Sequence, residues 1–186
     1  MVHSGPMSPS DACVVEHESR IFRGTSRARA LVNKSSKDTI MYTNVNHASF
    51  TVSSVEKAVE FYVHSLGMKL IDISERDVAF TERVTGIPGA SMRIAYVSVA
   101  DFKIELIEYL TSRGEKLDTR TCNVGSAHIC FNVDELDAMY AEMSAKGVKF
   151  ISTPVAIPAG PNRSGKVVYL KDCDGNTLEF IERPTP

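Results

Sequence analysis

The sequence predicts an α+β protein built from two tandem copies of a strand–helix–three-strand unit. The main observation is an internal repeat, because three short segments of the first half recur in the same order in the second half. The pairs are HASFTV (47–52) with HICFNV (128–133), GMKLI (67–71) with GVKFI (147–151), and IELIEY (104–109) with LEFIER (178–183). Within each copy, apolar residues first follow the spacing of a β-strand, then that of an α-helix, and then that of strands again. A repeat this long exceeds the period of solenoids, which favours two half-domains packed together.

The first copy covers about 44–111. Residues 44–52 are rich in β-branched and aromatic side chains, which predicts a strand. Ser53 and Ser54 then offer a helix N-cap, apolar residues recur at helical spacing as far as Leu66, and Gly67 ends the helix. Further strands are expected at 68–73, 91–99 and 102–110, with a helical insertion at 77–85 that ends at Gly86 and Pro88.

The second copy covers about 124–183. A strand is predicted at 125–133 and a helix at 134–146, with Leu136, Met139, Tyr140 and Met143 on one face and Gly147 at its end. A short strand follows at 148–151. The segments 166–170 and 177–182 are predicted to form a hairpin around Asp174-Gly175-Asn176, which is a strong turn signal.

Residues 1–40 differ from the folded domain expected at 41–186. They are rich in Ser, Pro, Arg and Lys and show no sustained apolar period, so we expect a mobile extension with at most a helical turn near 27–32. A mitochondrial presequence is the alternative interpretation. Asp11, Glu16 and Glu18 argue against it, because such segments are poor in acidic residues.

The composition excludes several classes of partner. The chain is 43% hydrophobic and 24% charged with a formal net charge of −2, which gives no electrostatic reason to expect nucleic acid or an anionic membrane as partner. No apolar run is long enough for a membrane span, and Met1–Ser10 lacks the features of a secretory signal. A cytoplasmic protein with a small-molecule substrate is therefore expected.

The four cysteines, Cys13, Cys122, Cys130 and Cys173, show no close metal-binding spacing. Free thiols in a reducing compartment are the expected state, and a cysteine-ligated zinc is not. Cys130 lies in an apolar run, where a buried free cysteine is common.

Each copy places one histidine on its first strand and one glutamate on its last. These residues are His47 and Glu105 in the first copy and His128 and Glu179 in the second. A glutamate inside an apolar strand is costly unless it is paired, and two imidazoles with two carboxylates suit a divalent transition metal. If the copies are related by a pseudo-twofold axis, the four residues meet around that axis and form one metal site.

The segments HASFTVSSVEKAVEFYVHSLGMKL (47–70) and VVYLKDCDGNTLEFIE (167–182) resemble the glyoxalase (vicinal oxygen chelate) superfamily. The resemblance covers about 44–183, although CDG stands where DPDG is usual. It implies paired βαβββ modules, each curling into a half-barrel around a metal cleft. It also implies that the first glutamate of each final strand is the ligand, hence Glu105 rather than Glu108 and Glu179 rather than Glu182.

The resemblance further implies a metal-dependent lyase or isomerase of lactoylglutathione lyase or methylmalonyl-CoA epimerase type. Such an enzyme chelates adjacent substrate oxygens on one divalent ion (Ni, Co, Zn or Mn) and moves an α-proton through an enediolate or enolate. Glu105 and Glu179 are then the candidate catalytic bases. An extradiol dioxygenase with iron is one alternative, which an intact Glu105 argues against. A non-catalytic antibiotic-binding protein is the other, although such members lose the metal residues.

Candidate substrate contacts lie near the closing hairpin. The loop 159–165 contains Asn162 and Arg163 and could act as a mobile lid or be an ordinary surface turn. Tyr96, Tyr109 and Tyr169 are each candidates for placing a hydroxyl in the cleft, and Tyr169 is grouped with Asn162 and Arg163 as a substrate-binding residue. Open strand edges and the resemblance together predict a symmetric homodimer.

Overall fold

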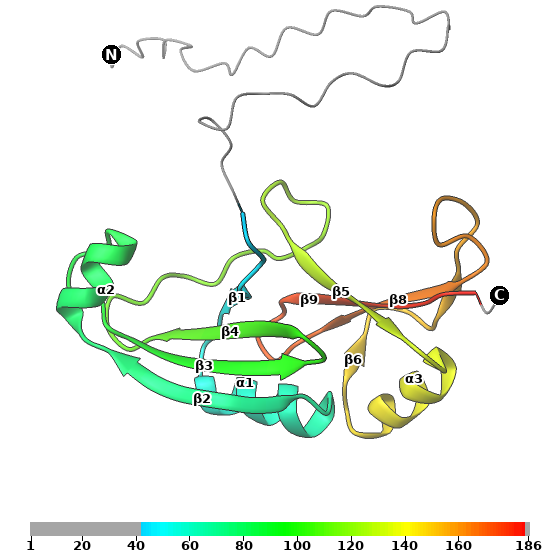
Figure 1. The fold of residues 1–186 in the computed structure, drawn as a ribbon, viewed down its shortest axis with the longest axis horizontal. Helices are drawn as coiled ribbons and strands as arrows, with labels where there is room; N and C mark the ends of the chain where they lie inside the picture. The colour runs from blue at the N-terminus through cyan, green and yellow to red at the C-terminus, as the bar shows by residue number, and fades with distance from the viewer. Residues whose placement is uncertain (1–41, 185–186) are drawn as a thin grey trace, which may run out of the picture. The chain divides into compact units, whose positions relative to one another are not determined.

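The computed structural model describes residues 42–184 (Figure 1). The predicted extension 1–40, its helical turn near 27–32 and Cys13 lie outside the described residues. Within 42–184, no helix is long and apolar enough to cross a membrane.

Module 1 is a four-stranded sheet with two helical segments between its strands. Its elements are β1 (Ala48–Thr51), α1 (Val55–Val59), η1 (Glu60–Ser65), β2 (Lys69–Arg76), α2 (Val78–Thr85), β3 (Met92–Val99) and β4 (Phe102–Tyr109). The strand order is β1-β4-β3-β2, with β1 parallel to β4 and the other neighbours antiparallel. The predicted strands of the first copy are confirmed, and β2 continues to Arg76.

The predicted helix after Ser54 begins as expected and then changes its winding. The Ser54 hydroxyl accepts the backbone N–H of Lys57, which satisfies a free donor of the first turn. The segment η1 is wound as a π-helix, and at its end the N–H of Leu66 bonds the carbonyl of Phe61, five residues back. Gly67 then adopts a left-handed conformation with φ of 73° and ends the helix.

The helical insertion at 77–85 is also confirmed. The Asp77 carboxylate caps α2 by accepting the N–H of Phe80, and Gly86 ends the helix with φ of 72°. Several apolar side chains of this region remain exposed, among them Phe80 and Val84.

Module 2 repeats the topology of module 1. Its elements are β5 (His128–Val133), α3 (Leu136–Ala145), β6 (Lys149–Phe150), β7 (Val155–Ala156), β8 (Lys166–Lys171) and β9 (Thr177–Glu182). The strand order is β5-β9-β8-β6, with β5 parallel to β9. Each order therefore places the first strand beside the last, which confirms the two-copy prediction. The pairing of β7 with β8 was not predicted.

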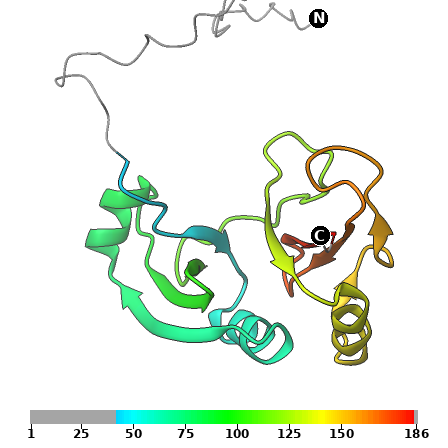
Figure 2. The same ribbon diagram turned by 45° about the vertical axis from the view of Figure 1, so that its right-hand side comes forward.

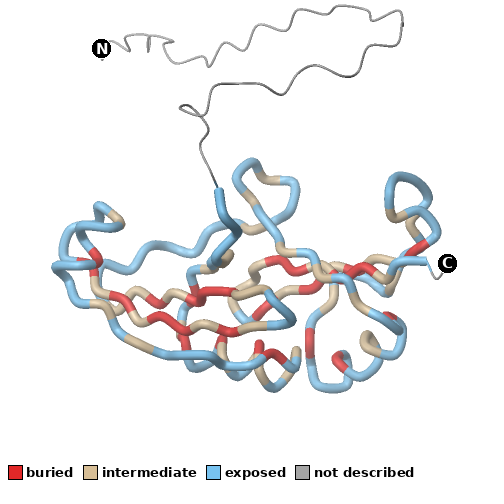
Figure 3. The backbone as a smooth tube through the Cα atoms, viewed as in Figure 1, coloured by how far each residue is buried: buried red, intermediate tan, exposed pale blue. Residues whose placement is uncertain are grey.

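One apolar core connects the two modules. Its buried members include Tyr62, Leu106, Leu136 and Leu178, which come from both copies. The buried stretches follow β3, β4, β8 and β9 and one side of α1, η1 and α3, whereas most of β2 and α2 is exposed (Figure 3). Neither sheet closes into a barrel (Figures 1 and 2), so each described module is an open, half-barrel sheet.

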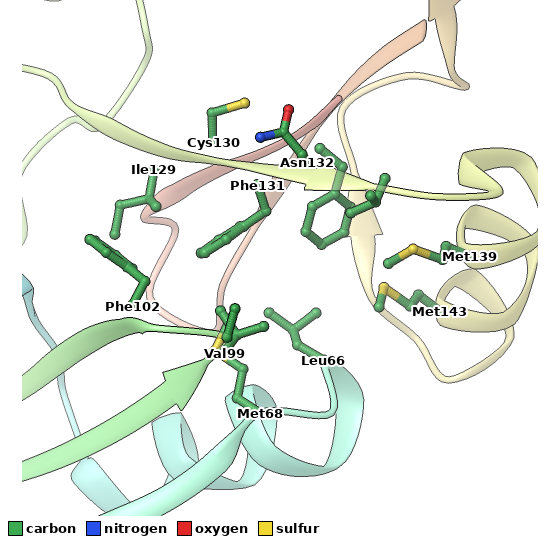
Figure 4. A pocket seen from close by; sticks show the side chains of 13 residues that line it. Leu66, Met68, Val99, Phe102, Ile129, Cys130, Phe131, Asn132, Met139 and Met143 are labelled. Atoms are coloured by element: carbon green, nitrogen blue, oxygen red, sulfur yellow. The ribbon is translucent and has the colours of Figure 1, made fainter. Parts of the chain in front are cut away.

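Polar contacts fix the closing hairpin of module 2 against module 1. The Tyr62 hydroxyl donates to Asp172 at 3.1 Å, and the backbone N–H of Ser53 donates to Asp174 at 2.9 Å. An apolar cavity of about 500 Å³ also lies between the modules, lined by residues such as Met68, Phe102 and Phe131 (Figure 4).

Candidate metal centre

Each module brings one histidine and one glutamate into contact. The Nε2 atom of His47 lies 3.3 Å from Oε2 of Glu105, and Nε2 of His128 lies 3.0 Å from Oε2 of Glu179. His47 directly precedes β1 instead of lying within it, whereas His128 is the first residue of β5. The histidines are partly exposed and the glutamate side chains are largely buried.

The two glutamates of each final strand have different contacts. Glu105 contacts His47, whereas Glu108 accepts the backbone N–H of Val55 at 3.0 Å and so caps α1 from the other face of β4. In module 2 Glu182 accepts the N–H of Leu136 at 2.7 Å in the same way. The second glutamate of each strand therefore caps a helix, and the first contacts the histidine of its own module.

A tyrosine stands beside each pair. Tyr96 lies opposite Glu105 in the β3–β4 register, and Tyr169 lies opposite Glu179 in the β8–β9 register. The ring of Tyr96 packs edge-on against His47 with centroids 5.6 Å apart, and Tyr169 lies 5.3 Å from His128. Of the three candidate tyrosines, these two are therefore the neighbours of the pairs.

The two tyrosines differ in their hydrogen bonds. The Tyr96 hydroxyl donates to Oε1 of Glu105. Partial burial, followed by this hydrogen bond, raises the pKa of Tyr96 to about 12, so the phenol stays protonated at neutral pH. Partial burial and the nearby charge of Glu179 also raise the pKa of Tyr169. Within residues 42–184 the Tyr169 hydroxyl makes no such bond to Glu179.

Cys130 belongs to the module 2 site, where we had expected a buried core thiol. It is exposed and lies opposite Glu179 in the β5–β9 register. Figure 4 shows the side chains of Cys130 and Asn132 on the opposite side of β5 from those of Ile129 and Phe131. Desolvation by its neighbours and the adjacent Glu179 carboxylate raise the pKa of the Cys130 thiol to about 12. The prediction of a buried cysteine is wrong because strand alternation puts Cys130 on the His128 side.

The donor sets fit two corners of a metal coordination sphere. A nitrogen or oxygen ligand lies about 2.1 Å from such an ion. When the ligand–metal–ligand angle is octahedral or tetrahedral, two neighbouring ligand atoms are therefore roughly 3.0–3.4 Å apart. The two His–Glu separations, 3.3 and 3.0 Å, match this spacing. In module 1 the Nδ1 atom of His47 lies 2.8 Å from Oδ1 of Asn46, and a proton on Nδ1 leaves Nε2 as the free donor atom.

The structure does not bring all four predicted ligands together. Among residues 42–184 no three histidine, cysteine or acidic side chains gather closely enough to hold one metal ion. The described residues therefore hold two separate His–Glu pairs, His47 with Glu105 and His128 with Glu179, which we call half-site 1 and half-site 2 of the candidate metal centre.

Among the described residues, the lid candidates Asn162 and Arg163 form no hydrogen bond or ion pair with either half-site. The loop that contains Asn162 and Arg163 closes on itself, because the N–H of Gly165 bonds the Asn162 carbonyl and the N–H of Arg163 bonds the Gly160 carbonyl. Asn162 is half-buried and Arg163 is exposed. Within the described part of the chain, neither side chain hydrogen bonds to His128 or Glu179. Their role in binding substrate stays a prediction.

Comparison with known proteins decides the family. The sequence profile of the Glyoxalase/Bleomycin resistance protein/Dioxygenase superfamily matches residues 44–180. This chain belongs to that superfamily. Among its relatives, a 2-epi-5-epi-valiolone epimerase of Actinomyces sp is 28% identical over 145 residues, covering 75% of this chain and 79% of the relative. A lactoylglutathione lyase of Neisseria meningitidis is 29% identical over 141 residues, covering 74% of this chain and 88% of the lyase.

Solved structures of the superfamily share the fold. A glyoxalase family protein from Bacillus cereus superposes with a TM-score of 0.66 at 22% identity, covering 82% of this chain and all of that protein. The predicted α+β fold with two βαβββ modules is therefore confirmed. The relatives named above are enzymes, and their names include both a lyase and an epimerase.

The repeat also marks neighbours of the two pairs. Tyr96 and Tyr169, which are among the three tyrosine candidates named from the sequence, precede Glu105 and Glu179 by nearly the same spacing. Ser49 and Cys130 likewise occupy the same position two residues after each histidine. The neighbour that the sequence prediction missed is Asn46, which no repeat signal marks.

Proposed function

We propose that this chain is a metal-dependent lyase or isomerase acting on a small carbonyl substrate. The single observation that carries the proposal is the pair of matched half-sites, in which both modules place an imidazole Nε2 against a carboxylate oxygen at equivalent strand positions. Family membership and the lyase and epimerase relatives support the same reaction class.

His47, Glu105, His128 and Glu179 would hold one divalent ion such as nickel, cobalt, zinc or manganese. When bound, that ion supplies a Lewis acid for adjacent oxygen atoms of the substrate. The chain's own contribution is to fix the nitrogen and oxygen donors on rigid strands and to keep the glutamate side chains largely out of water.

The glutamates are also the candidates for moving the proton. A carboxylate beside the carbon next to the substrate carbonyl can take its proton and return it to the neighbouring carbon, which is an isomerisation. Return of a proton by the second carboxylate to the opposite face of the same carbon is an epimerisation. Glu105 and Glu179 come from different modules, so the proposed site offers both possibilities.

We propose further that two copies of the chain complete each site. The half-sites of one chain are separate among the described residues, and a second copy in a symmetric dimer can supply the missing half. Half-site 1 of one protomer would then face half-site 2 of its partner, giving two equivalent metal sites.

The activity is tested on metal-loaded protein in deuterated water. The carbonyl substrates of lactoylglutathione lyase and of epimerases would be offered with each metal in turn, and deuterium at the carbon next to the carbonyl would be followed by NMR. We expect exchange with nickel, cobalt, zinc or manganese, and its loss in Glu179→Gln. Protein that binds only iron and consumes oxygen would instead be a dioxygenase, and protein that binds no metal would contradict the proposal.

Shared sites are tested with mixed dimers of two differently tagged variants. One protomer carries His47→Ala and its partner carries Glu179→Gln. If the sites are shared, one site of this dimer keeps all four ligands and the other site lacks both His47 and Glu179. Half of the wild-type metal content should therefore return. If each chain builds its own site, both sites stay defective and no metal is regained.

A second mixed dimer is the matched control. His47→Ala with Glu105→Gln places both changes in half-site 1, so each shared site lacks one ligand and no rescue is expected. If metal content returned in both mixed dimers, a site would bind metal with one of its four ligands missing. Separately, a chain that is monomeric at micromolar concentration would exclude the proposed dimer.

A further inference from the structure

The two half-sites treat their glutamates differently. In half-site 1 the two carboxylate oxygens of Glu105 have separate partners, because Oε1 accepts the Tyr96 hydroxyl and Oε2 faces His47. In half-site 2 Oε2 of Glu179 faces His128 in the same way. The neighbour of Glu179 on β5 is the Cys130 thiol, which is a weak hydrogen-bond donor.

We propose that Tyr96 is a positioning residue that makes Glu105 a ligand through a single oxygen, whereas Tyr169 has no such role toward Glu179. This inference rests on the proposed metal site. It follows from geometry, since the phenol competes for Oε1, holds the plane of the carboxylate and leaves Oε2, which faces His47, as the favoured ligand atom.

The surroundings of Tyr96 keep its hydroxyl in place. Its ring packs edge-on against His47 at an interplanar angle of 71°, and its backbone pairs directly with that of Glu105. The hydroxyl therefore reaches Oε1 from a neighbouring strand of the same sheet, without help from a mobile loop. A charge-assisted hydrogen bond of this kind is about twice as strong as one between neutral groups.

Tyr169 provides an internal comparison. It has the equivalent register position and stacks near His128, but its ring is tilted by 46° and its hydroxyl does not bond Glu179 within the described residues. The two tyrosines thus share a register position and a histidine neighbour, and they differ in ring angle and in the hydrogen bond. Any effect of Tyr96 that arises from packing alone should also be found for Tyr169.

The test compares Tyr96→Phe with Tyr169→Phe in the full-length protein. Nickel and cobalt affinities would be measured by competition with a coloured chelator, and the melting temperature of the metal-free variants would show that both fold. We expect the metal affinity of Tyr96→Phe to fall by about 10–100-fold, as for other partners of metal ligands, and that of Tyr169→Phe to change by less than about threefold.

A spectroscopic readout separates positioning from general loosening of the site. In the cobalt-loaded protein, release of Oε1 allows Glu105 to bind through both oxygens, so the visible absorption of Tyr96→Phe should change in shape as well as in amount. Tyr169→Phe should keep the wild-type spectrum.

The outcomes separate this inference from the proposed function. If the wild type binds no metal, the metal site itself is wrong and the inference falls with it. If the wild type binds metal and Tyr96→Phe matches it in affinity and spectrum, only the role of Tyr96 is overturned. Equal losses in both variants would likewise overturn it, because packing against the histidines would then explain the effect.

Discussion

The Glu108 carboxylate accepts the backbone N–H of Val55 at 3.0 Å, while Glu105, three residues earlier on β4, faces His47. A spacing of three residues on a strand places the two carboxylates on opposite faces of the sheet. The motif with two glutamates in each final strand therefore joins a carboxylate that caps a helix to one that contacts a histidine.

We expect Glu108→Ala to lower the free energy of unfolding by about 1–3 kcal/mol, because it leaves the N–H of Val55 unpaired beside a buried strand. It also removes the ion pair of Glu108 with Arg113. Urea denaturation of the metal-free protein measures the change.

The matched control is Glu105→Gln, whose amide oxygen can still accept the Tyr96 hydroxyl. It should change the free energy of unfolding by less than about 1 kcal/mol. Equal destabilisation by both substitutions would contradict the division of roles between the two glutamates.

Alkaline pH should weaken the contact between the modules at Tyr62. Burial, and then the adjacent Asp172 charge, raise the pKa of Tyr62 above its ordinary value of 10.0. The folded state therefore holds this proton more tightly than the unfolded state. The resulting stability is fully present below about pH 10 and is lost as the pH rises above it, by up to about 1.4 kcal/mol per pH unit.

The measurement compares wild type with Tyr62→Phe by denaturant titrations from pH 8 to pH 11.5, a range chosen around the ordinary tyrosine pKa of about 10. The difference in free energy of unfolding should be constant at the lower end and shrink at the upper end. Other groups that titrate in this range cancel in the difference. Parallel curves over the whole range would show that Tyr62 does not contribute.

Gly165 is required by a close backbone approach. A Cβ atom at this position would lie 2.3 Å from the carbonyl oxygen of Glu182, which cannot move without disturbing the β8–β9 pairing. Gly165→Ala should therefore cost about 1–3 kcal/mol in free energy of unfolding.

Gly114→Ala is its control, because a Cβ there meets no atom within 4 Å. It should be neutral, or stabilise by up to about 1 kcal/mol through the unfolded state. Thermal unfolding of the two variants side by side would show the contrast, and similar melting temperatures would contradict it.

The repeat allowed much of this molecule to be predicted. Ser54 and Asp77 cap their helices with their own side chains, and Gly67 and Gly86 end them in left-handed conformations, so local signals were sufficient there. The prediction of a buried Cys130 was wrong because it rested on the apolar run alone, whereas strand alternation puts Cys130 on the same side of β5 as His128.

By itself the sequence determined the two-copy order of elements and the histidine and glutamate that recur in each copy, because periods, caps and the repeat can be read from the order of residues. Only the tertiary structure decided that Glu105 faces His47 while Glu108 caps α1, and that Tyr96 reaches Oε1 of Glu105. It also decided that, among residues 42–184, the four candidate residues form two separate His–Glu pairs. Such contacts join strands far apart in the chain, so they depend on how the sheets pair and pack.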